Sequence, residues 1–256
     1  MATKTLTPRQ QELLTQVQRE GFGSVESLAK HFDVTHQTVR RDINYLAGLK
    51  LLKRYHGGAG LPSSIENFAY DTRQTLFRDA KRRIGQLVAQ HIPNNSSLFI
   101  NLGTTTEEVA KALLRHRGLR VITNNLNVAA AMSGNEDCEV IVAGGMVRSR
   151  DRGVIGEATV DFIREFKVDF GVIGISGIER DGTLLDFDYR EVRVSEAIIA
   201  NSRRVFLAAD HSKFGRQALV RLAKLSQIAA LFTDRPVPAD MADVFADAKT
   251  EVYVVE

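Results

Sequence analysis

A run of small polar residues near the middle of the chain has the composition of a phosphate-binding loop. Gly103 precedes three threonines, Thr104, Thr105 and Thr106, and the run lies between a predicted strand over residues 97–101 and a predicted helix. Glycine lets the backbone approach a ligand, the hydroxyls can donate hydrogen bonds, and the amino end of a helix favours an anion. The pattern predicts a phosphate cradle, although an ordinary threonine helix cap would have the same composition.

Polar residues of similar types follow four other predicted strands. In an α/β sheet the carboxyl ends of the strands form the ligand-binding edge, so we expect these loops to converge there. Amides and hydroxyls suit sugar-like hydroxyl groups, and Lys213 together with the Gly103 loop suits a phosphate. The predicted ligand is therefore a small phosphorylated polyol. The candidate residues in these loops are Thr123, Asn124, Asn125, Gly144, Gly145, Arg148, Ser176 and Lys213.

Basic and amide side chains near the amino terminus form a second candidate site. A helix that is predicted to begin after Thr35 has Val39 and Ile43 on its inward face. Its outward face carries side chains that can hydrogen-bond to phosphates and base edges in a major groove. We expect Thr35 and the outward residues to contact DNA; these outward residues are His36, Gln37, Thr38, Arg40 and Arg41.

The stretch that follows predicts a small β-hairpin. Residues of β type run from Leu51 into the paired glycines Gly57 and Gly58. Beside a helix-turn-helix, such a hairpin would be the wing of a winged helix, and its basic side chains would lie against phosphates. The alternative is a solvated basic surface with His56 as a turn residue. The candidate wing contacts are Lys53, Arg54, His56 and Gly57.

These two sites require different scaffolds. Up to about residue 60, capping residues and apolar spacing predict three helices, the last two joined by a short turn as in a helix-turn-helix. From residue 81 onward, helical segments alternate with strands, which favours an α/β fold with a mostly parallel sheet. We therefore expect a DNA-binding domain over residues 1–60, a linker over 61–80 and an effector-sensing domain over 81–256.

Charge and composition agree with this division. Residues 1–60 hold nine basic and five acidic residues, a net of +4, and the remainder holds 25 and 26, a net of −1. An apolar content of 44% excludes a disordered chain, and no apolar run is long enough to span a membrane. The polar amino-terminal segment lacks the apolar core of a signal peptide, so we expect a cytoplasmic protein.

Cofactor motifs are missing from the sequence. It contains no Walker A motif, no dinucleotide fingerprint and no Cys/His cluster with zinc spacing. We therefore expect no cofactor and no metal, and the ATPase reading fails.

The amino-terminal motifs resemble those of the DeoR family of bacterial transcriptional regulators. Residues 24–59 read SVESLAKHFDVTHQTVRRDINYLAGLKLLKRYHGGA, which contains a helix like the family's TxRRDLxxL and a wing like its RxHGGA. The resemblance implies a winged helix-turn-helix that binds double-stranded operator DNA. The matching residues are Thr38, Arg40, Arg41, Asp42, Leu46, Arg54, His56, Gly57, Gly58 and Ala59.

The remainder resembles the effector domain of the same family, which is similar to ribose-5-phosphate isomerase. Residues 103–106 match the isomerase phosphate loop, residues 209–213 resemble its ADESK segment, and Glu191 is nearest to its catalytic glutamate. The acidic DGAD motif of the isomerase is replaced here by GISG at residues 174–177. Because an isomerase needs carboxylates to move protons, the resemblance implies binding without turnover. Asp188 could then hold ligand hydroxyls.

The resemblance, which extends over nearly the whole chain, implies a repressor of glycerol-use genes that leaves its operator when it binds sn-glycerol 3-phosphate. It also implies a homo-oligomer, either a dimer or a tetramer, and no membrane partner. The residues alone indicate only a small phosphorylated polyol. Two alternatives stay open: a repressor of the same family that senses another phosphorylated sugar or an aldonate, and an active sugar-phosphate isomerase with a DNA-binding appendage.

Overall fold

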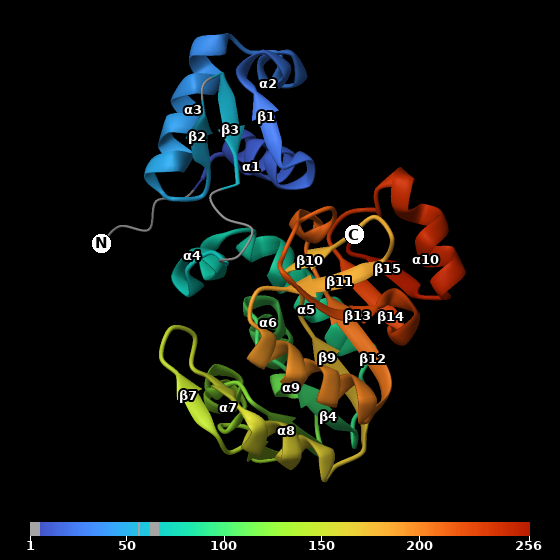
Figure 1. The fold of residues 1–256 in the computed structure, drawn as a ribbon. Coiled ribbons are helices and arrows are strands. Elements are labelled where there is room, and N and C mark those ends of the chain that lie inside the picture. Colours follow the sequence, from blue (N-terminus) through green and yellow to red (C-terminus); the bar gives the residue numbers. More distant parts are fainter. Residues whose placement is uncertain (1–5, 56, 62–66) are drawn as a thin grey trace.

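A small unit at the amino end of the chain lies on a larger α/β unit, with helix α4 (Tyr70–Thr75) between them (Figure 1). The structure is a computed structural model, which describes residues 6–55, 57–61 and 67–256. The small unit contains three helices and a three-stranded antiparallel sheet of order β1-β3-β2. Its elements are α1 (Pro8–Glu20), β1 (Phe22–Ser24), α2 (Val25–Phe32), α3 (His36–Gly48), β2 (Lys53–Tyr55) and β3 (Gly58–Gly60).

Capping residues define the helices of the small unit. The side chains of Thr7, Ser24 and Thr35 each accept a hydrogen bond from the backbone N–H three residues later, which satisfies one unpaired donor of each helix. Asp33 adopts a left-handed conformation (φ 50°) between α2 and α3, and this keeps the turn short. The predicted helix-turn-helix and its hairpin wing are therefore confirmed.

A seven-stranded, wholly parallel sheet forms the centre of the larger unit. Its strands lie in the order β15-β14-β12-β9-β4-β5-β6, so the chain order reverses between β4 and β9. Loops that leave such a switch point in opposite directions open a crevice at the carboxyl edge. The strands are β4 (Ser97–Ile100), β5 (Leu119–Thr123), β6 (Cys138–Val142), β9 (Val168–Ile173), β12 (Ser202–Ala208), β14 (Ala230–Thr233) and β15 (Glu251–Val254).

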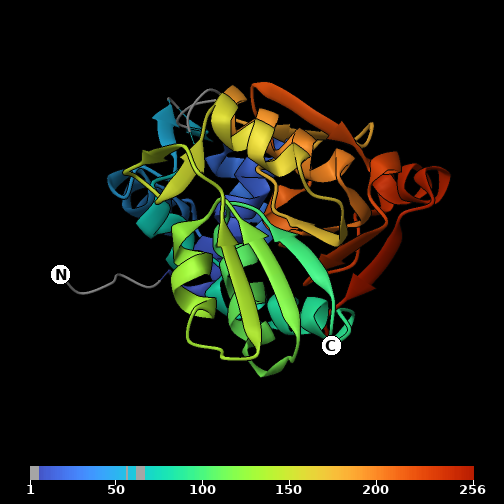
Figure 2. The same ribbon diagram turned by 90° about the horizontal axis from the view of Figure 1, so that it is seen from below.

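Helices cover both faces of this sheet (Figure 2). Leu98 and Ile100 of β4 belong to one buried apolar cluster, and Phe99 between them belongs to the other. This alternation buries both faces, as parallel sheets require. The first cluster contains α5 (Arg78–Gln90), α6 (Thr104–Ala112) and α7 (Leu126–Met132), and the second contains α8 (Glu157–Arg164), α9 (Tyr189–Ala200) and α10 (Ala242–Ala248).

Short elements that the sequence did not predict complete the larger unit. They include two small antiparallel sheets, whose strands are two to five residues long. The strands are β7 (Met146–Arg148) and β8 (Gly153–Ile155), then β10 (Gly177–Ile178), β11 (Thr183–Asp186) and β13 (Val220–Lys224). The 3-10 helices are η1 (Leu113–Arg115), η2 (His211–Lys213), η3 (Leu225–Gln227) and η4 (Ala239–Met241).

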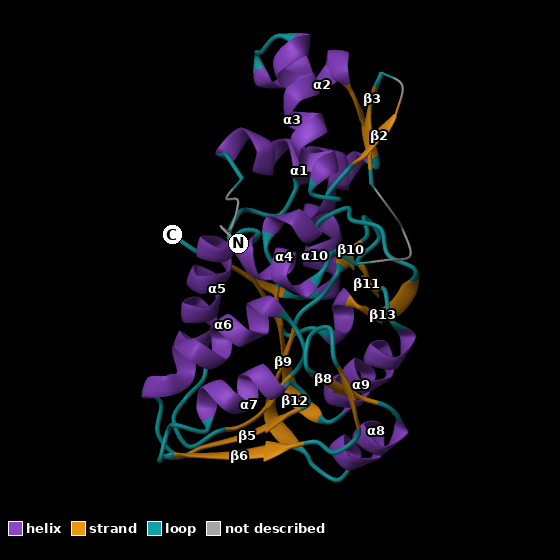
Figure 3. Ribbon diagram, turned by 90° about the vertical axis from the view of Figure 1, so that its left-hand side faces the viewer, coloured by secondary structure: helices purple, strands orange, loops and turns teal. Residues whose placement is uncertain are grey.

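The described part of the predicted linker, residues 67–80, contacts both units, and Figure 3 shows α4 between them. Helix α5 begins at Arg78, three residues before its predicted start, and Leu76, Phe77 and Ala80 join the apolar core of the small unit. A direct contact also joins the units, because Thr15 Oγ1 of α1 lies 3.4 Å from His211 Nε2. The two units are therefore joined by a direct side-chain contact as well as by the segment around α4.

Candidate functional site

The outward face of α3 presents the side chains that were expected to contact DNA. His36, Gln37, Arg40 and Arg41 are exposed, opposite the buried inward face. Thr35 belongs to the helix cap, and its hydroxyl oxygen lies 3.0 Å from that of Thr38. The exposed cations and amide at the start of α3 are suited to phosphates and base edges.

Asp42, the next residue in the same motif, points the other way. Its buried carboxylate accepts hydrogen bonds from Arg9 Nε at 2.7 Å and from Gln10 Nε2 at 3.0 Å. Both donors belong to α1, so Asp42 fixes α3 against α1. The motif thus combines two outward arginines with one inward structural aspartate.

The wing is held against α3 by a side-chain contact. Arg54 Nη1 donates to Asn44 Oδ1 at 3.2 Å, and a groove of about 290 Å³ lies between the wing and α3. A Cβ on Gly58 would lie 2.4 Å from the carbonyl oxygen of Gly23, so only glycine permits this strand pairing. Lys53 and Gly57 are exposed. His56 lies outside the described residues.

The Gly103 loop occupies the crevice at the switch point of the parallel sheet. Gly103 has a φ of 147°, a conformation that other residues rarely adopt. Thr106 Oγ1 lies 2.8 Å from the carbonyl oxygens of both Asn101 and Gly103, which fixes the loop. Thr104 Oγ1 instead donates out of the loop to the carbonyl oxygen of Arg73 at 3.4 Å. Thr104 can therefore exchange that acceptor for a ligand.

Cationic side chains from four parts of the chain gather beside this loop: Arg73, Lys81, Lys213 and Arg216. Burial lowers the pKa of Lys81 to about 8 and that of Lys213 to about 7, although Asp210 opposes both shifts. Burial also disfavours ionisation of Asp210, but Lys213 and Lys81 outweigh it and lower the pKa of Asp210 to about 2. The lowered lysine pKa values mean that the protein does not fully compensate these charges, which favours an anionic ligand.

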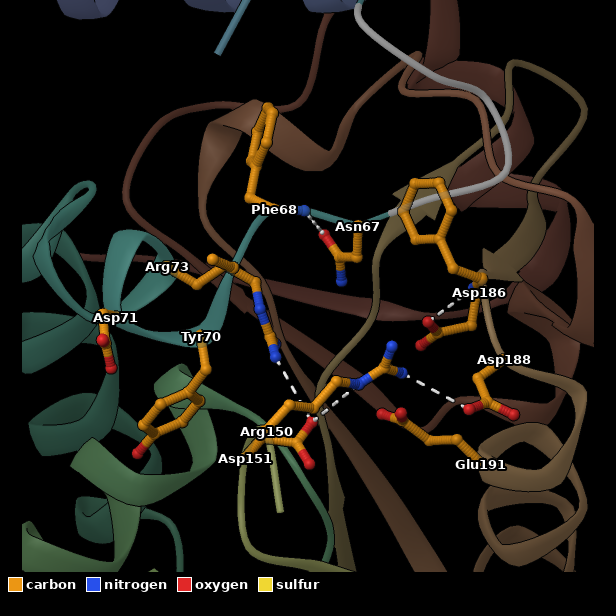
Figure 4. Close-up of a pocket in the computed structure, with 12 residues that line it drawn as sticks. Asn67, Phe68, Tyr70, Asp71, Arg73, Arg150, Asp151, Asp186, Asp188 and Glu191 are labelled. Carbon is orange, nitrogen blue, oxygen red and sulfur yellow. Dashed lines mark hydrogen bonds and ion pairs between the residues drawn. The ribbon is translucent and has the colours of Figure 1, made fainter. Parts of the chain in front are cut away.

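A cavity of about 300 Å³ opens next to these cations and is rich in carboxylates (Figure 4). Asp151, Asp186, Asp188 and Glu191 line it. Arg73 reaches into it from α4 toward Asp151, and Arg150 reaches Asp188 at 3.3 Å. Carboxylates accept hydrogen bonds from hydroxyl groups, so this cavity is suited to a polyol.

Arg148 organises the carboxylates of the cavity. Its guanidinium group contacts Asp151 at 2.8 and 2.6 Å, Asp188 at 2.9 Å and Glu191 at 2.6 Å. Burial, aided by the charge of Asp186, raises the pKa of Glu191 to about 7 against the opposing effect of Arg148. Near neutral pH, Glu191 can therefore either donate or accept a hydrogen bond.

Several of the predicted effector residues make internal hydrogen bonds in the loops around the site. The hydroxyl of Thr123 donates to the carbonyl oxygen of Ile100, Asn124 Nδ2 donates to that of Val154, and Asn125 caps α7. All three are buried.

The other predicted loops differ in how close they lie to the cavity. The carbonyl oxygen of Gly144 accepts from Thr159 Oγ1 at 2.9 Å, and Gly144 and Gly145 are exposed. Ser176 donates to Asp186 Oδ1 at 2.9 Å and so touches the cavity wall. Of the predicted effector residues, Asp188 and Glu191 thus line the cavity, and Arg148 and Ser176 contact carboxylates that line it.

Residues of the linker are part of the site, and the sequence analysis missed them. Asn67, Phe68, Tyr70 and Arg73 line the cavity. Asn67 also bridges Ser176 and Arg216, at 3.2 and 2.9 Å. The sequence did contain a signal for these site residues, a cluster of aromatic, amide and guanidinium side chains within the predicted linker.

Within the described part of the chain, no helix is long and apolar enough to cross a membrane. The same residues contain no group of three or more His, Cys, Asp and Glu side chains that could hold a metal ion.

Comparison with known proteins divides the chain in two. Residues 9–65 match the model of the DeoR-like helix-turn-helix domain, and residues 77–235 match that of the DeoR C-terminal sensor domain. The chain is 52% identical to the glycerol-3-phosphate regulon repressor of Escherichia coli (strain K12), over 94% of this chain and 96% of that protein. Identity is 50% with the repressor of the same name from Haemophilus influenzae, over 96% of each chain. It is 40% with the HTH-type transcriptional repressor CsqR of Escherichia coli (strain K12), over 98% and 96%.

Among solved structures, similarity is more distant. A D-ribose-5-phosphate isomerase in complex with phospho-erythronic acid has a TM-score of 0.39 at 12% identity, and 54% of each chain is covered. The translation initiation factor eIF-2B of Pyrococcus horikoshii OT3 has a TM-score of 0.47 at 16% identity, over 89% of this chain and 95% of that one. Similarity at this level carries no conclusion about chemistry.

Proposed function

Because the chain belongs to the DeoR family of transcriptional regulators, we propose that it represses genes for the use of glycerol or glycerol 3-phosphate. The relatives described above are named as repressors and not as enzymes. It binds operator DNA and leaves it when sn-glycerol 3-phosphate binds. The observation that carries this proposal is the 50–52% identity, over almost the full length, to two glycerol-3-phosphate regulon repressors.

The sensor site supports a ligand with one anionic and one hydroxylated end. The phosphate would lie at the Gly103 loop with Thr104 and Lys213, and the glycerol hydroxyls would lie at Asp188 and Glu191. The cation cluster and the carboxylate cavity are adjacent, and Arg73 lies between them: its guanidinium contacts Asp151, and its charge shifts the pKa of Lys213. A cavity of about 300 Å³ is at the small end of the range for ligand sites, as a three-carbon ligand requires.

The DNA site is assigned to α3 and the wing. Arg40, Arg41 and Gln37 would contact the major groove, and Lys53 and Arg54 would contact phosphates beside it. A homo-oligomer, dimer or tetramer, would present paired recognition helices to half-sites one helical turn apart. In this proposal the DNA-binding domain spans residues 1–60 and the sensing domain residues 81–256.

Fluorescence anisotropy tests the proposal directly. Labelled DNA from upstream of glycerol-use genes is titrated with the protein at fixed, stated salt, because salt sets such affinities. sn-Glycerol 3-phosphate is then added, with glycerol and inorganic phosphate as separate controls. Release by glycerol 3-phosphate alone is the expected result. Specific binding that only another phosphorylated sugar reverses would keep the repressor and replace the effector, and an absence of specific DNA binding would overturn the proposal.

A further inference from the structure

Two donors of the proposed anion site are held by the linker helix. The ammonium group of Lys81 and the hydroxyl of Thr104 both donate to the carbonyl oxygen of Arg73, which belongs to α4. A phosphate at the Gly103 loop would draw on the same donors. The hydroxyl of Thr104 has one proton and cannot donate to both acceptors, and the partly negative carbonyl oxygen would repel a phosphate bound to the ammonium group of Lys81.

Helix α4 is fastened to the sensor mainly by Tyr70. The hydroxyl of Tyr70 lies 2.8 and 3.0 Å from the two carboxylate oxygens of Glu107, which is buried on α6. Asn127 Nδ2 lies 2.8 Å from the same hydroxyl, and Gln74, which belongs to α4 itself, orients that hydroxyl by donating to it at 2.6 Å. Because the helix has only six residues, these bonds and the contacts of Arg73 decide whether it stays in place.

The residues on both sides of α4 pack against the DNA-binding unit. Leu76 and Phe77, which follow the helix, are buried in the apolar core of that unit. On the preceding side, Phe68 and Ala69 line a cavity together with Leu49, at the end of α3. A displacement of α4 would therefore move atoms that position the recognition helix.

From this arrangement we propose that α4 competes with the phosphate of the effector for Lys81 and Thr104, so that effector binding undocks α4 and thereby weakens operator binding. The inference deepens the proposed function and depends on it for the identity of the effector. The competition itself requires only an anion at the Gly103 loop.

Arg73 is placed to assist the exchange. Its Nη2 lies 3.5 Å from Asp151 Oδ2, a long contact, and its buried Nε has no hydrogen-bond partner within the described residues. Asp151 keeps a shorter two-pronged contact with Arg148 at 2.8 and 2.6 Å. Arg73 can therefore turn to a phosphate without leaving a buried carboxylate unpaired.

Linkage fixes which arrangement binds the operator. If an anion that displaces α4 releases DNA, the arrangement with α4 in place must be the operator-competent one. Weakening the hold on α4 must then strengthen effector binding and weaken operator binding, and the two fold-changes multiply to the factor by which docking of α4 is weakened. A residue that simply touches the effector has the opposite signature, since its loss weakens effector binding.

The experiment uses Tyr70→Phe in the full-length protein, with Tyr253→Phe as the matched control. Tyr253 also donates to a glutamate, Glu251 at 2.6 Å, but on β15 at the edge of the sheet. Isothermal titration with glycerol 3-phosphate gives the effector Kd, and anisotropy at the same salt gives the operator Kd. We expect the effector Kd of Tyr70→Phe to fall and its operator Kd to rise, with the two fold-changes multiplying to about five- to tenfold. Tyr253→Phe should match the wild type in both.

Weaker effector binding by Tyr70→Phe would make Tyr70 a ligand contact and overturn the proposal, and so would unchanged affinities. Gln74→Met, which removes a second bond to the same hydroxyl, should give smaller shifts of the same signs, and thermal melts check that all variants fold.

Failure of the wild type to bind glycerol 3-phosphate would refute the proposed effector alone. The lower operator affinity of Tyr70→Phe would then still test the role of α4. If the wild type did not bind the operator, the repressor proposal would fall. The test of α4 would then be protease cleavage within residues 67–76. Inorganic phosphate, at concentrations far above the one used as the anisotropy control, should accelerate this cleavage in the wild type, and an unchanged cleavage rate would overturn the competition.

Discussion

Adjacent residues of the motif on α3 have opposite roles. Arg40 and Arg41 are exposed, whereas Asp42 is buried against α1. A helix turns by about 100° per residue, so neighbours in sequence need not share a face. From residue type alone, all three would be expected to contact DNA. Only the position of each residue around the helix separates the two exposed arginines from the buried structural aspartate.

Replacing Arg41 by alanine should weaken operator binding and leave effector binding intact. Loss of a guanidinium contact to DNA costs about 1–3 kcal/mol, which is a rise of about five- to 160-fold in the operator Kd. Anisotropy measures it, with Arg117→Ala, an exposed arginine of the larger unit, as the control. An unchanged operator Kd for Arg41→Ala would contradict the assignment of α3.

Effector binding should weaken as the pH rises from about 7 to about 9. Burial lowers the pKa of Lys213 to about 7 and that of Lys81 to about 8, so both lose their protons over this range, and a bound phosphate favours their charged forms. Binding at pH about 8 should therefore take up protons, which titration calorimetry in buffers of different ionisation enthalpy detects. Lys213→Met should bind the effector more weakly and flatten the profile. A wild-type profile that stays flat over this range would place the phosphate elsewhere.

At the scale of elements, the long and well-capped segments could be predicted from the sequence. Thr35 caps a helix as predicted, and β4 ends one residue before the end of the strand predicted over residues 97–101. The strands β7, β8, β10, β11 and β13 could not, because most have only two to four residues and they lie among glycines and charged residues rather than in separate apolar runs. Those strands carry or adjoin Arg148, Ser176 and Asp186, so the wall of the cavity emerges only from tertiary structure.

The linker helix was missed for a related reason. Six residues with no buried side chain show no apolar periodicity, and what holds α4 is a set of hydrogen bonds to residues distant in sequence. Lys213 and the Gly103 loop could be predicted because they lie in local motifs. Arg73 and Tyr70 could not, because only the folded chain brings them to the site.

The contact between α1 and α3 should be a structural one. Asp42→Asn should lower the stability of the DNA-binding unit by about 1–3 kcal/mol, because a charge-assisted hydrogen bond to Arg9 is lost in a buried place. Thermal unfolding measures it, and Asp161→Asn, which affects an exposed ion pair on α8, should have little effect. If Asp42→Asn kept full stability but lost DNA binding, Asp42 would contact DNA.

At the scale of the whole molecule, the symmetric homo-oligomer that we propose would constrain the operator. Paired recognition helices fit half-sites on one side of the duplex, separated by a whole number of helical turns. Inserting about five base pairs between the half-sites should therefore reduce affinity strongly, and inserting about ten should largely restore it. Anisotropy on the three DNAs tests this, and equal affinity for all three would mean that half-sites are bound independently.

Leu76, Phe77 and Ala80 follow the DNA-binding unit at some distance in the sequence, yet they complete its apolar core. A gene fusion that cut the chain at residue 60 would leave that core uncovered, and the fragment should be unstable and prone to aggregate. Recombination that gives this DNA-binding unit a new sensor must therefore carry residues 67–80 with it. The segment of the chain that can be inherited as one module is thus longer than the segment that touches DNA.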